Sequence, residues 1–252
     1  MKVVIANLKM NFVTAKECDQ YLDTLNTVWK NNKHIDVVNL IVCPSTLFIE
    51  RFAKRLPDGV LLGGQDAFWE VRGSYTGESS PKSLKDASVK AVICGHSERR
   101  FNWHETNEQI GRKASAIIAQ GMVAIVCVGE TREERDHDDM STVIAEQVTT
   151  ALANISFEQL SQVVIAYEPR WAIGASVTPT TQEIMQVHIL IQKILVKKYG
   201  TEALEKITII YGGSVTAALM DDVCVNAHMD GVLVGRESGN PSELIKMMDS
   251  LV

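Results

Sequence analysis

The chain has 252 residues, of which 46% are hydrophobic and 22% are charged, and its net charge is −6 at neutral pH. This composition is typical of a soluble globular protein, and the negative charge gives no support to a nucleic-acid-binding role. A small acidic protein can still concentrate positive potential in one cleft, so an anionic substrate remains compatible with the sequence. The length suits an α/β barrel, and we expect residues 1–252 to form a single domain.

The N-terminal segment has one lysine followed by the short apolar run Val3–Ala6, which is too short for the apolar region of a signal peptide. No apolar run in the sequence approaches the length of a membrane span. The five cysteines are odd in number and scattered, without a CxxC pair or zinc-ligand spacing. We therefore expect free thiols in a reducing cytoplasm, no metal and no membrane contact.

Short apolar runs recur about every thirty residues, and a helix-like segment follows each of them. The runs are mostly apolar throughout rather than alternating, which is typical of parallel strands covered on both faces. In chain order they are Val3–Ala6, Val37–Cys43, Val60–Gln65, Val89–Cys94, Met122–Gly129, Val163–Tyr167, Ile207–Tyr211 and Gly231–Gly235.

The segments between the runs are amphipathic, as at residues 15–32 and 180–200. The second begins at threonines with Glu183 close behind and ends in two lysines and Gly200, which are helix start and stop signals. No linker or low-complexity tract divides the chain. Eight strand–helix units predict a (β/α)8 barrel of eight parallel strands surrounded by helices. A doubly wound open sheet is the alternative, but no GxGxxG motif follows the first run to favour it.

In such barrels the active site lies at the carboxyl ends of the strands, so the polar residues after each apolar run are the candidates. These positions hold Asn7, Lys9, Gln65, Gly95, His96, Glu130, Glu168, Gly212–Ser214 and Gly235.

Glu168 follows an apolar run and precedes a proline, which favours extended backbone at the residue before it. A carboxylate shielded from water has a raised pKa, which suits a general base. The alternative is a structural glutamate that caps a helix or pairs with an arginine. His96 lies between a strand and a predicted helix, whose positive end disfavours the imidazolium, so we expect a neutral ring. The five other histidines fit structural roles.

Lys9 at the end of the first run is either a solvated strand end or a cation that faces an anionic ligand. The segments Tyr211–Val215 and Leu233–Ser238 contain glycines after the seventh and eighth runs. Loops at these two places form the recurrent phosphate site of barrels from backbone N–H groups. A double glycine also marks any tight turn, but its place here favours a phosphate.

Six motifs together resemble the triosephosphate isomerase family over nearly the whole chain, in family order and at family spacing. They are ANLKMN, GHSERR, CVGET, AYEPRWAIG, YGGSV and DGVLVG. The resemblance implies interconversion of dihydroxyacetone phosphate and D-glyceraldehyde 3-phosphate through an enediolate, in glycolysis and gluconeogenesis. It implies neither cofactor nor metal.

By the same resemblance Glu168 shuttles the proton, His96 is a neutral electrophile, and Lys9 stabilises developing charge while Asn7 orients the substrate. Glu98 and Cys127 support the site, and Ser97 holds Glu168 when the lid is open. The substrate phosphate takes N–H groups of Gly174, Ser214, Gly235 and Arg236. The segment Pro169–Pro179 is a mobile lid whose apolar residues exclude water from an enediolate that loses phosphate when wet.

The segment Asp66–Glu78 matches the protruding loop that family members insert beside a neighbouring subunit's active site. Thr76 then contacts Asn7 and His96 across the interface, with Glu78 and Arg99 pairing nearby. An ordinary surface loop fits poorly with Phe68, Trp69, Val71 and Tyr75 exposed together, so we expect a homodimer.

Three residues depart from the family pattern. Ser176 and Arg236 occupy glycine positions, and Pro179 replaces a residue whose N–H meets the hydroxyl of Tyr211 in the closed lid. Because proline has no N–H, this contact is either missing or supplied by Thr178 or Thr180. The N–H of Arg236 can still serve a phosphate if φ is negative, with the guanidinium facing solvent. We expect these changes to tune lid motion and affinity while the chemistry stays intact.

The rival functions are another phosphate-binding barrel enzyme, such as a phosphosugar epimerase, and a barrel whose main role is partner binding. The first does not need Lys9, His96 and Glu168 together, and the intact set argues against the second.

Overall fold

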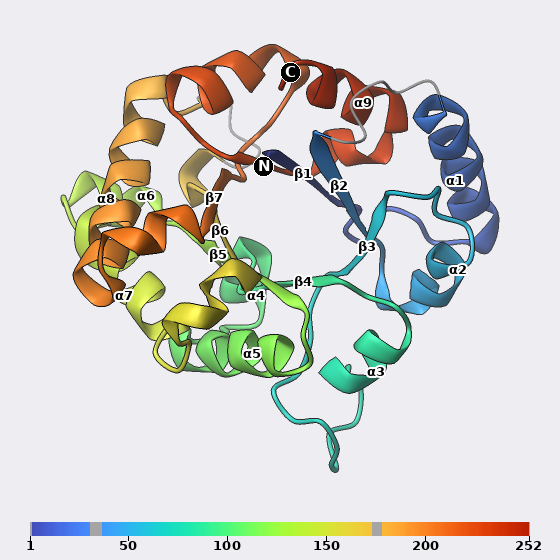
Figure 1. The fold of residues 1–252 in the computed structure, drawn as a ribbon, viewed down its shortest axis with the longest axis horizontal. Helices are drawn as coiled ribbons and strands as arrows, with labels where there is room; N and C mark the ends of the chain where they lie inside the picture. The colour runs from blue at the N-terminus through green and yellow to red at the C-terminus, as the bar shows by residue number, and fades with distance from the viewer. Residues whose placement is uncertain (1, 31–36, 173–177, 252) are drawn as a thin grey trace.

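The computed structural model describes residues 2–30, 37–172 and 178–251. Eight parallel strands form a closed barrel in which each strand pairs with the next along the chain and β8 pairs with β1 (Figure 1). The strands are β1 (Lys2–Asn7), β2 (Val38–Cys43), β3 (Leu61–Gly64), β4 (Ala91–Cys94), β5 (Val123–Val128), β6 (Val163–Tyr167), β7 (Thr208–Tyr211) and β8 (Gly231–Val234). The predicted (β/α)8 barrel is therefore confirmed.

Helices surround the barrel (Figure 1). The α-helices are α1 (Ala15–Trp29), α2 (Ile49–Ala53), α3 (Pro81–Asp86), α4 (Ser97–Asn102), α5 (Asn107–Ala119), α6 (Arg132–Asp136), α7 (Met140–Ala151), α8 (Thr181–Tyr199) and α9 (Pro241–Asp249). Shorter 3-10 turns are η1 (Thr46–Phe48), η2 (Phe157–Gln162), η3 (Arg170–Ala172), η4 (Thr201–Glu205), η5 (Ala217–Leu219) and η7 (Arg236–Gly239), and η6 (Asp221–Asn226) is a π-helix.

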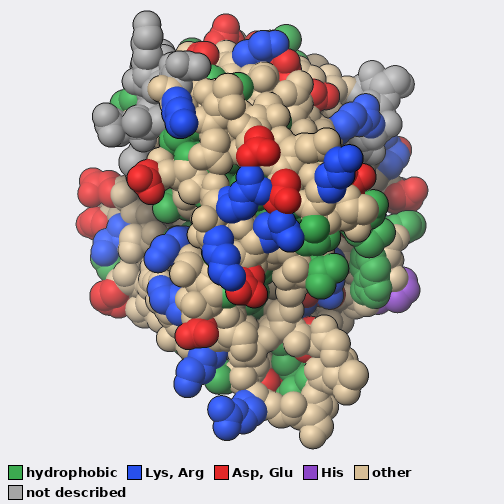
Figure 2. Space-filling view, turned by 90° about the vertical axis from the view of Figure 1, so that its right-hand side faces the viewer, with side chains coloured by type: hydrophobic (Ala, Val, Ile, Leu, Met, Phe, Trp, Pro, Cys, Tyr) green, Lys and Arg blue, Asp and Glu red, His purple; other side chains and the backbone are tan. Residues whose placement is uncertain are grey.

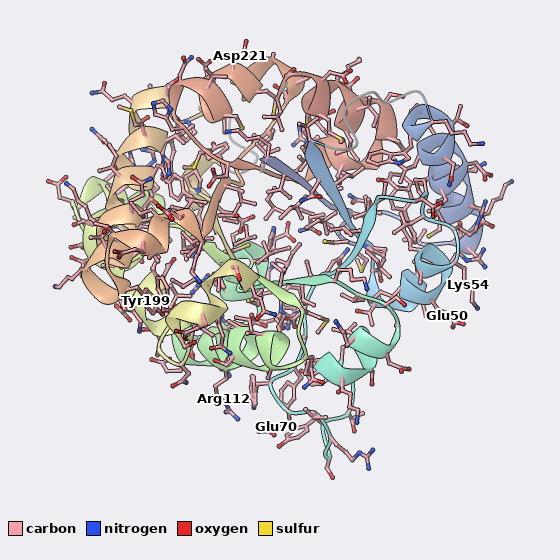
Figure 3. All side chains as sticks on the ribbon, in the orientation of Figure 1. Glu50, Lys54, Glu70, Arg112, Tyr199 and Asp221 are labelled. Atoms are coloured by element: carbon pink, nitrogen blue, oxygen red, sulfur yellow. The ribbon has the colours of Figure 1, made fainter. Side chains whose placement is uncertain are left out.

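The predicted start and stop signals of the long helix α8 act as expected. The hydroxyl of Thr180 accepts the N–H of Glu183, and the Glu183 carboxylate accepts the N–H of Thr180, which is a reciprocal cap. At the other end Gly200 has φ +90°, a left-handed conformation that stops the helix. The hydroxyl of Tyr199 then donates to the carbonyls of Leu152 and Ile155, which ties the end of α8 to the segment after α7 (Figure 3).

The apolar strands supply two cores at once. Val3 and Ile5 of β1 belong to the cluster inside the barrel, whereas Val4 and Ala6 belong to the larger cluster between the barrel and the helices. Because successive side chains of a strand point to opposite faces, a strand covered on both faces must be apolar at every position. This explains the continuous apolar runs in the sequence.

The segment of residues 66–79 projects from the barrel between β3 and α3, at the bottom of Figure 1. The expectation that its four large apolar residues are exposed together is wrong for Phe68, which is only 7% exposed, and for Trp69, which is half-buried. Its ring stacks on Trp69 with centroids 4.1 Å apart and lies 4.5 Å from the ring of Tyr75. Val71 and Tyr75 remain 43% and 46% exposed. The aromatic rings thus shield one another and stiffen the projecting segment.

A residue of α5 holds this segment from the side. The guanidinium of Arg112 lies 4.4 Å from the ring centroid of Trp69 and pairs with Glu70 at 3.1 Å (Figure 3). A cation over an aromatic face and an ion pair on the same group fix the base of the projection.

Every cysteine is buried and has a free thiol. Across residues 2–30, 37–172 and 178–251, no helix combines the length and the apolar character that crossing a membrane requires. Within the same ranges the side chains form no cluster of three or more potential metal ligands.

Candidate active site

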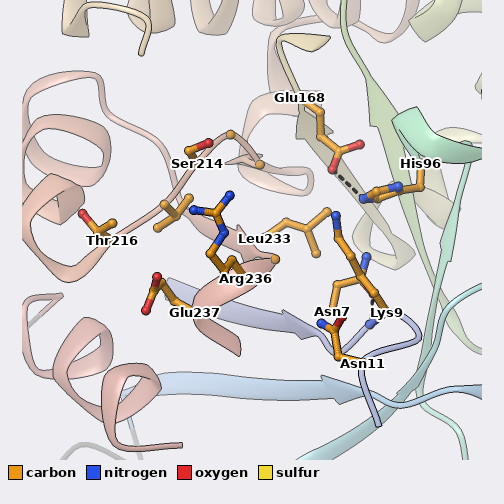
Figure 4. A pocket seen from close by; sticks show the side chains of 14 residues that line it. Asn7, Lys9, Asn11, His96, Glu168, Ser214, Thr216, Leu233, Arg236 and Glu237 are labelled. Atoms are coloured by element: carbon orange, nitrogen blue, oxygen red, sulfur yellow. Dashed lines mark hydrogen bonds and ion pairs between the residues drawn. The ribbon is translucent and has the colours of Figure 1, made fainter. Parts of the chain in front are cut away.

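A cavity of about 320 Å³ opens at the carboxyl ends of the strands (Figure 4). Most of the predicted site residues line it, from the ends of five different strands. They are Asn7, Lys9, His96, Glu168, Ser214, Gly235 and Arg236. Glu98 is not part of the lining but contacts two lining residues, Lys9 and His96. Gly174 lies outside the described residues. The size lies at the low end of the range of about 300–1,000 Å³ for ligand pockets, which suits a small molecule.

Glu168 is positioned by the two strands beside β6. Its N–H donates to the carbonyl of Val128 at 2.7 Å, which extends the pairing of β5 and β6 by one residue. Its side chain lies over Gly212, where an added Cβ would come within 2.7 Å of the Glu168 Cγ. The glycine after β7 is therefore required by the close approach of the carboxylate, in addition to any role in a turn.

The carboxylate of Glu168 is only 3% exposed but has several donors. Oε1 lies 3.2 Å from Nε2 of His96, and Oε2 accepts the backbone N–H of Ser97 at 3.1 Å. The thiol of Cys127 also hydrogen-bonds to this carboxylate. Ser97 thus holds Glu168 through its N–H, whereas its own hydroxyl has no partner among the described residues.

These donors reverse the expected titration of Glu168. Burial raises the pKa of the carboxyl, but the His96 ring, the N–H of Ser97 and the thiol of Cys127 together hold its pKa below the ordinary value. The expectation of a raised pKa is therefore wrong for this arrangement, because it considered burial without the hydrogen-bond donors. Glu168 is a buried carboxylate that is kept ionised by its contacts.

His96 follows a left-handed turn at Gly95, which has φ +69° and where a Cβ would come within 2.8 Å of Ile110. The residue after that turn caps α4, and Nδ1 of His96 accepts the N–H of Glu98 at 3.2 Å. An accepting Nδ1 has no proton, so the neutral ring carries its proton on Nε2. Nε2 is the nitrogen that faces Glu168 and the cavity (Figure 4).

The pKa of His96 also differs from the expectation based on the helix end. Burial lowers this pKa, but the charge and hydrogen bond of the Glu168 carboxylate, with a smaller effect of Glu98, raise it, so that the net direction is upward while Glu168 faces the ring. The prediction of a lowered pKa left out a neighbouring carboxylate that is distant in sequence. The N–H of Glu98 on Nδ1 still opposes double protonation of the ring.

Lys9 has a left-handed backbone, with φ +50°, which is uncommon for a residue with a side chain. The side chains of two neighbours hold it there: Oδ1 of Asn7 accepts the Lys9 N–H at 3.1 Å, and Nε2 of Gln65 donates to the Lys9 carbonyl at 2.8 Å. The Lys9 ammonium lies 2.5 Å from Oε1 of Glu98. The turn after β1 thus directs the cation into the cavity.

The sequence predicted no specific role for Gln65, although it is one of the polar residues after a strand. Its amide donates to the carbonyls of both Lys9 and Cys43, at 2.8 and 2.9 Å, and so links the ends of β1 and β2. Its place after the third run was visible in the sequence, but its partners were not.

Glu130 is a second residue whose role the sequence did not show. It is fully buried after β5, and its Oε1 accepts hydrogen bonds from Tyr167, Trp171 and Arg135 at 3.1, 2.8 and 2.9 Å. The Trp171 ring is also faced by the guanidinium groups of Arg132 and Arg135, at 4.4 and 4.9 Å. The apolar residues after Glu168 are therefore anchored by a buried carboxylate and two cations.

The two glycine-containing turns lie on one side of the cavity. The hydroxyl of Ser214 donates to the carbonyl of Ala172 at 3.2 Å, which links the turn after β7 to the segment after Glu168. The hydroxyl of the buried Ser238 donates to the carbonyls of Asn7 and Gly235, which fixes the turn after β8. Arg236 is not among the residues with positive φ, which meets the condition set for its N–H.

The N–H of Thr180 donates to Glu183 in the cap of α8, so in this arrangement it does not replace the N–H that Pro179 lacks. Pro179 is buried and Thr178 is exposed. Ser176, like Gly174, lies outside the described residues.

The residues expected at a subunit interface lie in the segment after β3 and in α4. Thr76 and Glu78 are exposed on the projecting segment. Arg99 forms ion pairs within its own chain, with Asp66 at 3.0 Å and Glu105 at 2.5 Å.

The cavity therefore combines a buried carboxylate, a ring N–H, an ammonium group and two turns rich in backbone N–H groups. This set can remove a proton from carbon, stabilise the oxygen that gains charge and hold an anion. The sequence model of the triosephosphate isomerase family matches residues 2–251, which is nearly the whole chain. The chain therefore belongs to the triosephosphate isomerase family and is an isomerase of triose phosphates.

Proposed function

We propose that Glu168 is the base of this isomerase and shuttles a proton between the two carbons of the triose phosphate through an enediolate. Glu168 takes a proton from C1 of dihydroxyacetone phosphate, the C–H electron pair forms the C1–C2 double bond, and the C2 oxygen takes up the charge. Return of the proton to C2, with transfer of the O1 hydroxyl proton to O2, gives D-glyceraldehyde 3-phosphate. Atoms and charge balance without a metal or cofactor.

His96 polarises the carbonyl oxygen as a neutral donor. Its Nε2 points into the cavity, and the N–H of Glu98 on Nδ1 favours the tautomer that has the proton on Nε2. Substrate between the ring and Glu168 would separate the pair, and the carboxylate would then no longer raise the pKa of His96. Burial would keep the ring neutral.

Lys9 stabilises the charge that develops on the substrate oxygens, and Asn7 holds both the substrate and the backbone of Lys9. Glu98 keeps the Lys9 ammonium in place before substrate arrives, through their 2.5 Å ion pair. The ammonium is half-buried in the cavity, where it acts on charge more strongly than in water.

The substrate phosphate is held by the N–H groups of Gly174, Ser214, Gly235 and Arg236. The turn after β8 supports this proposal because the N–H groups of Gly235 and Arg236 donate to no carbonyl in the turn and loop contacts of the described residues. Residues 169–179 close over the bound substrate and exclude water. The anchors of Trp171 on Glu130 and of Ala172 on Ser214 suit the fixed end of such a lid.

The chain forms one domain over residues 1–252 and acts as a cytoplasmic homodimer in glycolysis and gluconeogenesis. Exposed apolar side chains follow the carboxyl ends of β1 to β4 and support a subunit interface there. They are Met10, Val13, Leu47, Tyr75, Phe101 and Trp103. Figure 2 shows hydrophobic side chains gathered on the right of one face, above the projecting segment. The loop Asp66–Glu78 would insert into the partner, with Thr76 facing Asn7 and His96.

The observation that carries the mechanism is the 3.2 Å contact of Glu168 with His96 in the cavity that Lys9 also lines. A coupled assay with D-glyceraldehyde 3-phosphate on the parent and on Glu168→Gln tests it. We expect the substitution to lower turnover by about 10²- to 10⁴-fold, the usual contribution of a general base. Unchanged turnover in a folded Glu168→Gln protein would overturn the mechanism.

A further inference from the structure

The side chain of Arg236 lines the active-site cavity, at a position where the family pattern has glycine. It begins η7 directly after Gly235 and is exposed at the mouth of the cavity that it lines. With the other described residues, its guanidinium forms neither a hydrogen bond nor an ion pair. A guanidinium has five N–H donors, and such a group at the wall of a cavity can bind whatever anion enters.

The charges around the cavity leave this cation uncompensated. Lys9, the other cation of the described lining, is paired with Glu98 at 2.5 Å. Of the lining carboxylates, Glu168 is engaged with His96. Glu237 projects to the other side of the turn from the Arg236 guanidinium in Figure 4.

The direction of the side chain is the second observation. In Figure 4 the guanidinium projects from the turn after β8 toward the turn that carries Ser214. These two turns supply the N–H groups of the proposed phosphate site. The turn of Arg236 is also fixed, because the hydroxyl of Ser238 donates to the carbonyls of Asn7 and Gly235. The side chain thus extends from one set of N–H donors in the direction of the other.

We infer that the guanidinium of Arg236 binds the phosphate group of the substrate directly, in addition to the backbone N–H groups. The inference rests on the proposed placement of the phosphate between the two turns. A guanidinium can donate two parallel hydrogen bonds to two phosphate oxygens, which an ammonium group cannot match. A glycine at this position offers the phosphate only neutral backbone N–H groups, whereas Arg236 adds a full positive charge. Substrate binding by this chain therefore depends more strongly on the charge of the phosphate dianion.

The test separates the charge from the bulk of the side chain. Arg236→Met keeps an unbranched apolar side chain and removes the charge. Arg236→Lys keeps the charge but cannot donate the two parallel hydrogen bonds of a guanidinium. Lys197→Met removes one exposed cation from α8 and is the matched control. The measurements are kcat and KM with D-glyceraldehyde 3-phosphate, the inhibition constant of inorganic phosphate, and kcat/KM with D-glyceraldehyde, which has no phosphate.

For Arg236→Met we expect kcat/KM with the phosphorylated substrate to fall, and the inhibition constant of phosphate to rise, by about 10- to 100-fold, as for lost hydrogen bonds to a charged group. The value for D-glyceraldehyde should not change. Arg236→Lys should show a smaller loss, and Lys197→Met none. If Arg236→Met does not fold, as judged by its thermal unfolding, the inhibition constant of phosphate for Arg236→Lys tests the inference instead: a rise supports it, and a parent-like value overturns it.

Two results would overturn the inference: parent-like phosphate inhibition in Arg236→Met, or an equal loss for the substrates with and without phosphate. The outcome is separate from that of the proposed mechanism, which Glu168→Gln tests through turnover of either substrate. If Arg236→Met binds phosphate as the parent does while Glu168→Gln has lowered turnover, the assignment of Glu168 as the base still holds.

Discussion

The ring of His96 connects Glu168 to the backbone of Glu98. Its Nε2 lies 3.2 Å from Oε1 of Glu168, and its Nδ1 accepts the Glu98 N–H at the same distance. The first contact favours a charged ring and the second favours a neutral one, so the protonation of His96 depends on where the Glu168 carboxylate lies. Substrate between the two side chains would shift this balance toward the neutral donor that the mechanism needs.

This coupling predicts a change in the titration of His96 when Glu168 is neutralised. In Glu168→Gln the pKa of His96 should fall below its value in the parent, because the carboxylate that raises it is gone and burial then dominates. NMR titration of the ring nitrogens measures this directly. Glu237→Gln is the control, since it neutralises another lining carboxylate. A pKa that stays the same or rises in Glu168→Gln would contradict the coupling.

Glu130 should matter for stability as well as for the lid. Glu130→Gln weakens three hydrogen bonds to a buried charge, so we expect the free energy of unfolding to fall by about 1.5–3 kcal/mol. Denaturant unfolding measures the change, and Glu133→Gln on the exposed face of α6 is the matched control. Equal stability of the two variants would show that the Glu130 contacts are not worth more than a surface charge.

Stability should also depend on pH through His188. This ring is buried, and its Nδ1 lies 3.2 Å from the carbonyl of Ala227. Burial lowers its pKa, and the hydrogen bond to the Ala227 carbonyl opposes this shift; Asp230 has a smaller raising effect, and His228 and Lys2 have smaller lowering effects. Because the folded-state pKa is depressed, the unfolded chain takes up the proton first. The contribution of His188 is complete above the unfolded pKa and is lost as pH falls below about 6.5.

The comparison of variants isolates this effect. Unfolding free energies measured between pH 5 and pH 8 should fall less steeply toward acid in His188→Gln than in the parent, by up to about 1.4 kcal/mol per pH unit. His137→Gln, which changes an exposed histidine, should keep the parent slope. Identical slopes in all three proteins would show that His188 takes no part.

The proposed homodimer predicts how the molecular mass of the protein in solution changes when the interface is disrupted. Tyr75→Asp places a charge at an exposed position of the projecting segment, where the partner would bury it. We expect a monomer in sedimentation at concentrations where the parent is a dimer, with a loss of activity that parallels dissociation. Leu204→Asp, on the partly exposed η4, should leave the mass unchanged. A parent that is itself monomeric at all concentrations would refute the proposed interface.

Local patterns in the sequence were sufficient for the fold. The apolar runs predicted all eight strands to within two residues at each end, because strands with two covered faces have no polar positions. The threonine, glutamate and glycine at the ends of α8 likewise act where they were expected. The rule that sites lie at the carboxyl ends of strands then led to Asn7, Lys9, His96 and Glu168.

The contacts between side chains from different strands could not be predicted in the same way. The directions of the pKa shifts of Glu168 and His96 were both wrong, since each depends on the other across 72 residues of chain. Gln65 and Glu130 were visible as polar residues after strands, but their partners were not. The buried position of Phe68 depends on ring contacts within its loop, which composition does not reveal.

The most direct test of the mechanism follows the proton itself. In D2O the enzyme should catalyse incorporation of deuterium at C1 of dihydroxyacetone phosphate, detected by NMR, because Glu168 exchanges the proton that it removes. Glu168→Gln should slow this incorporation by about 10²- to 10⁴-fold while the fold is retained. Incorporation at the parent rate in Glu168→Gln would contradict the assignment of Glu168 as the base.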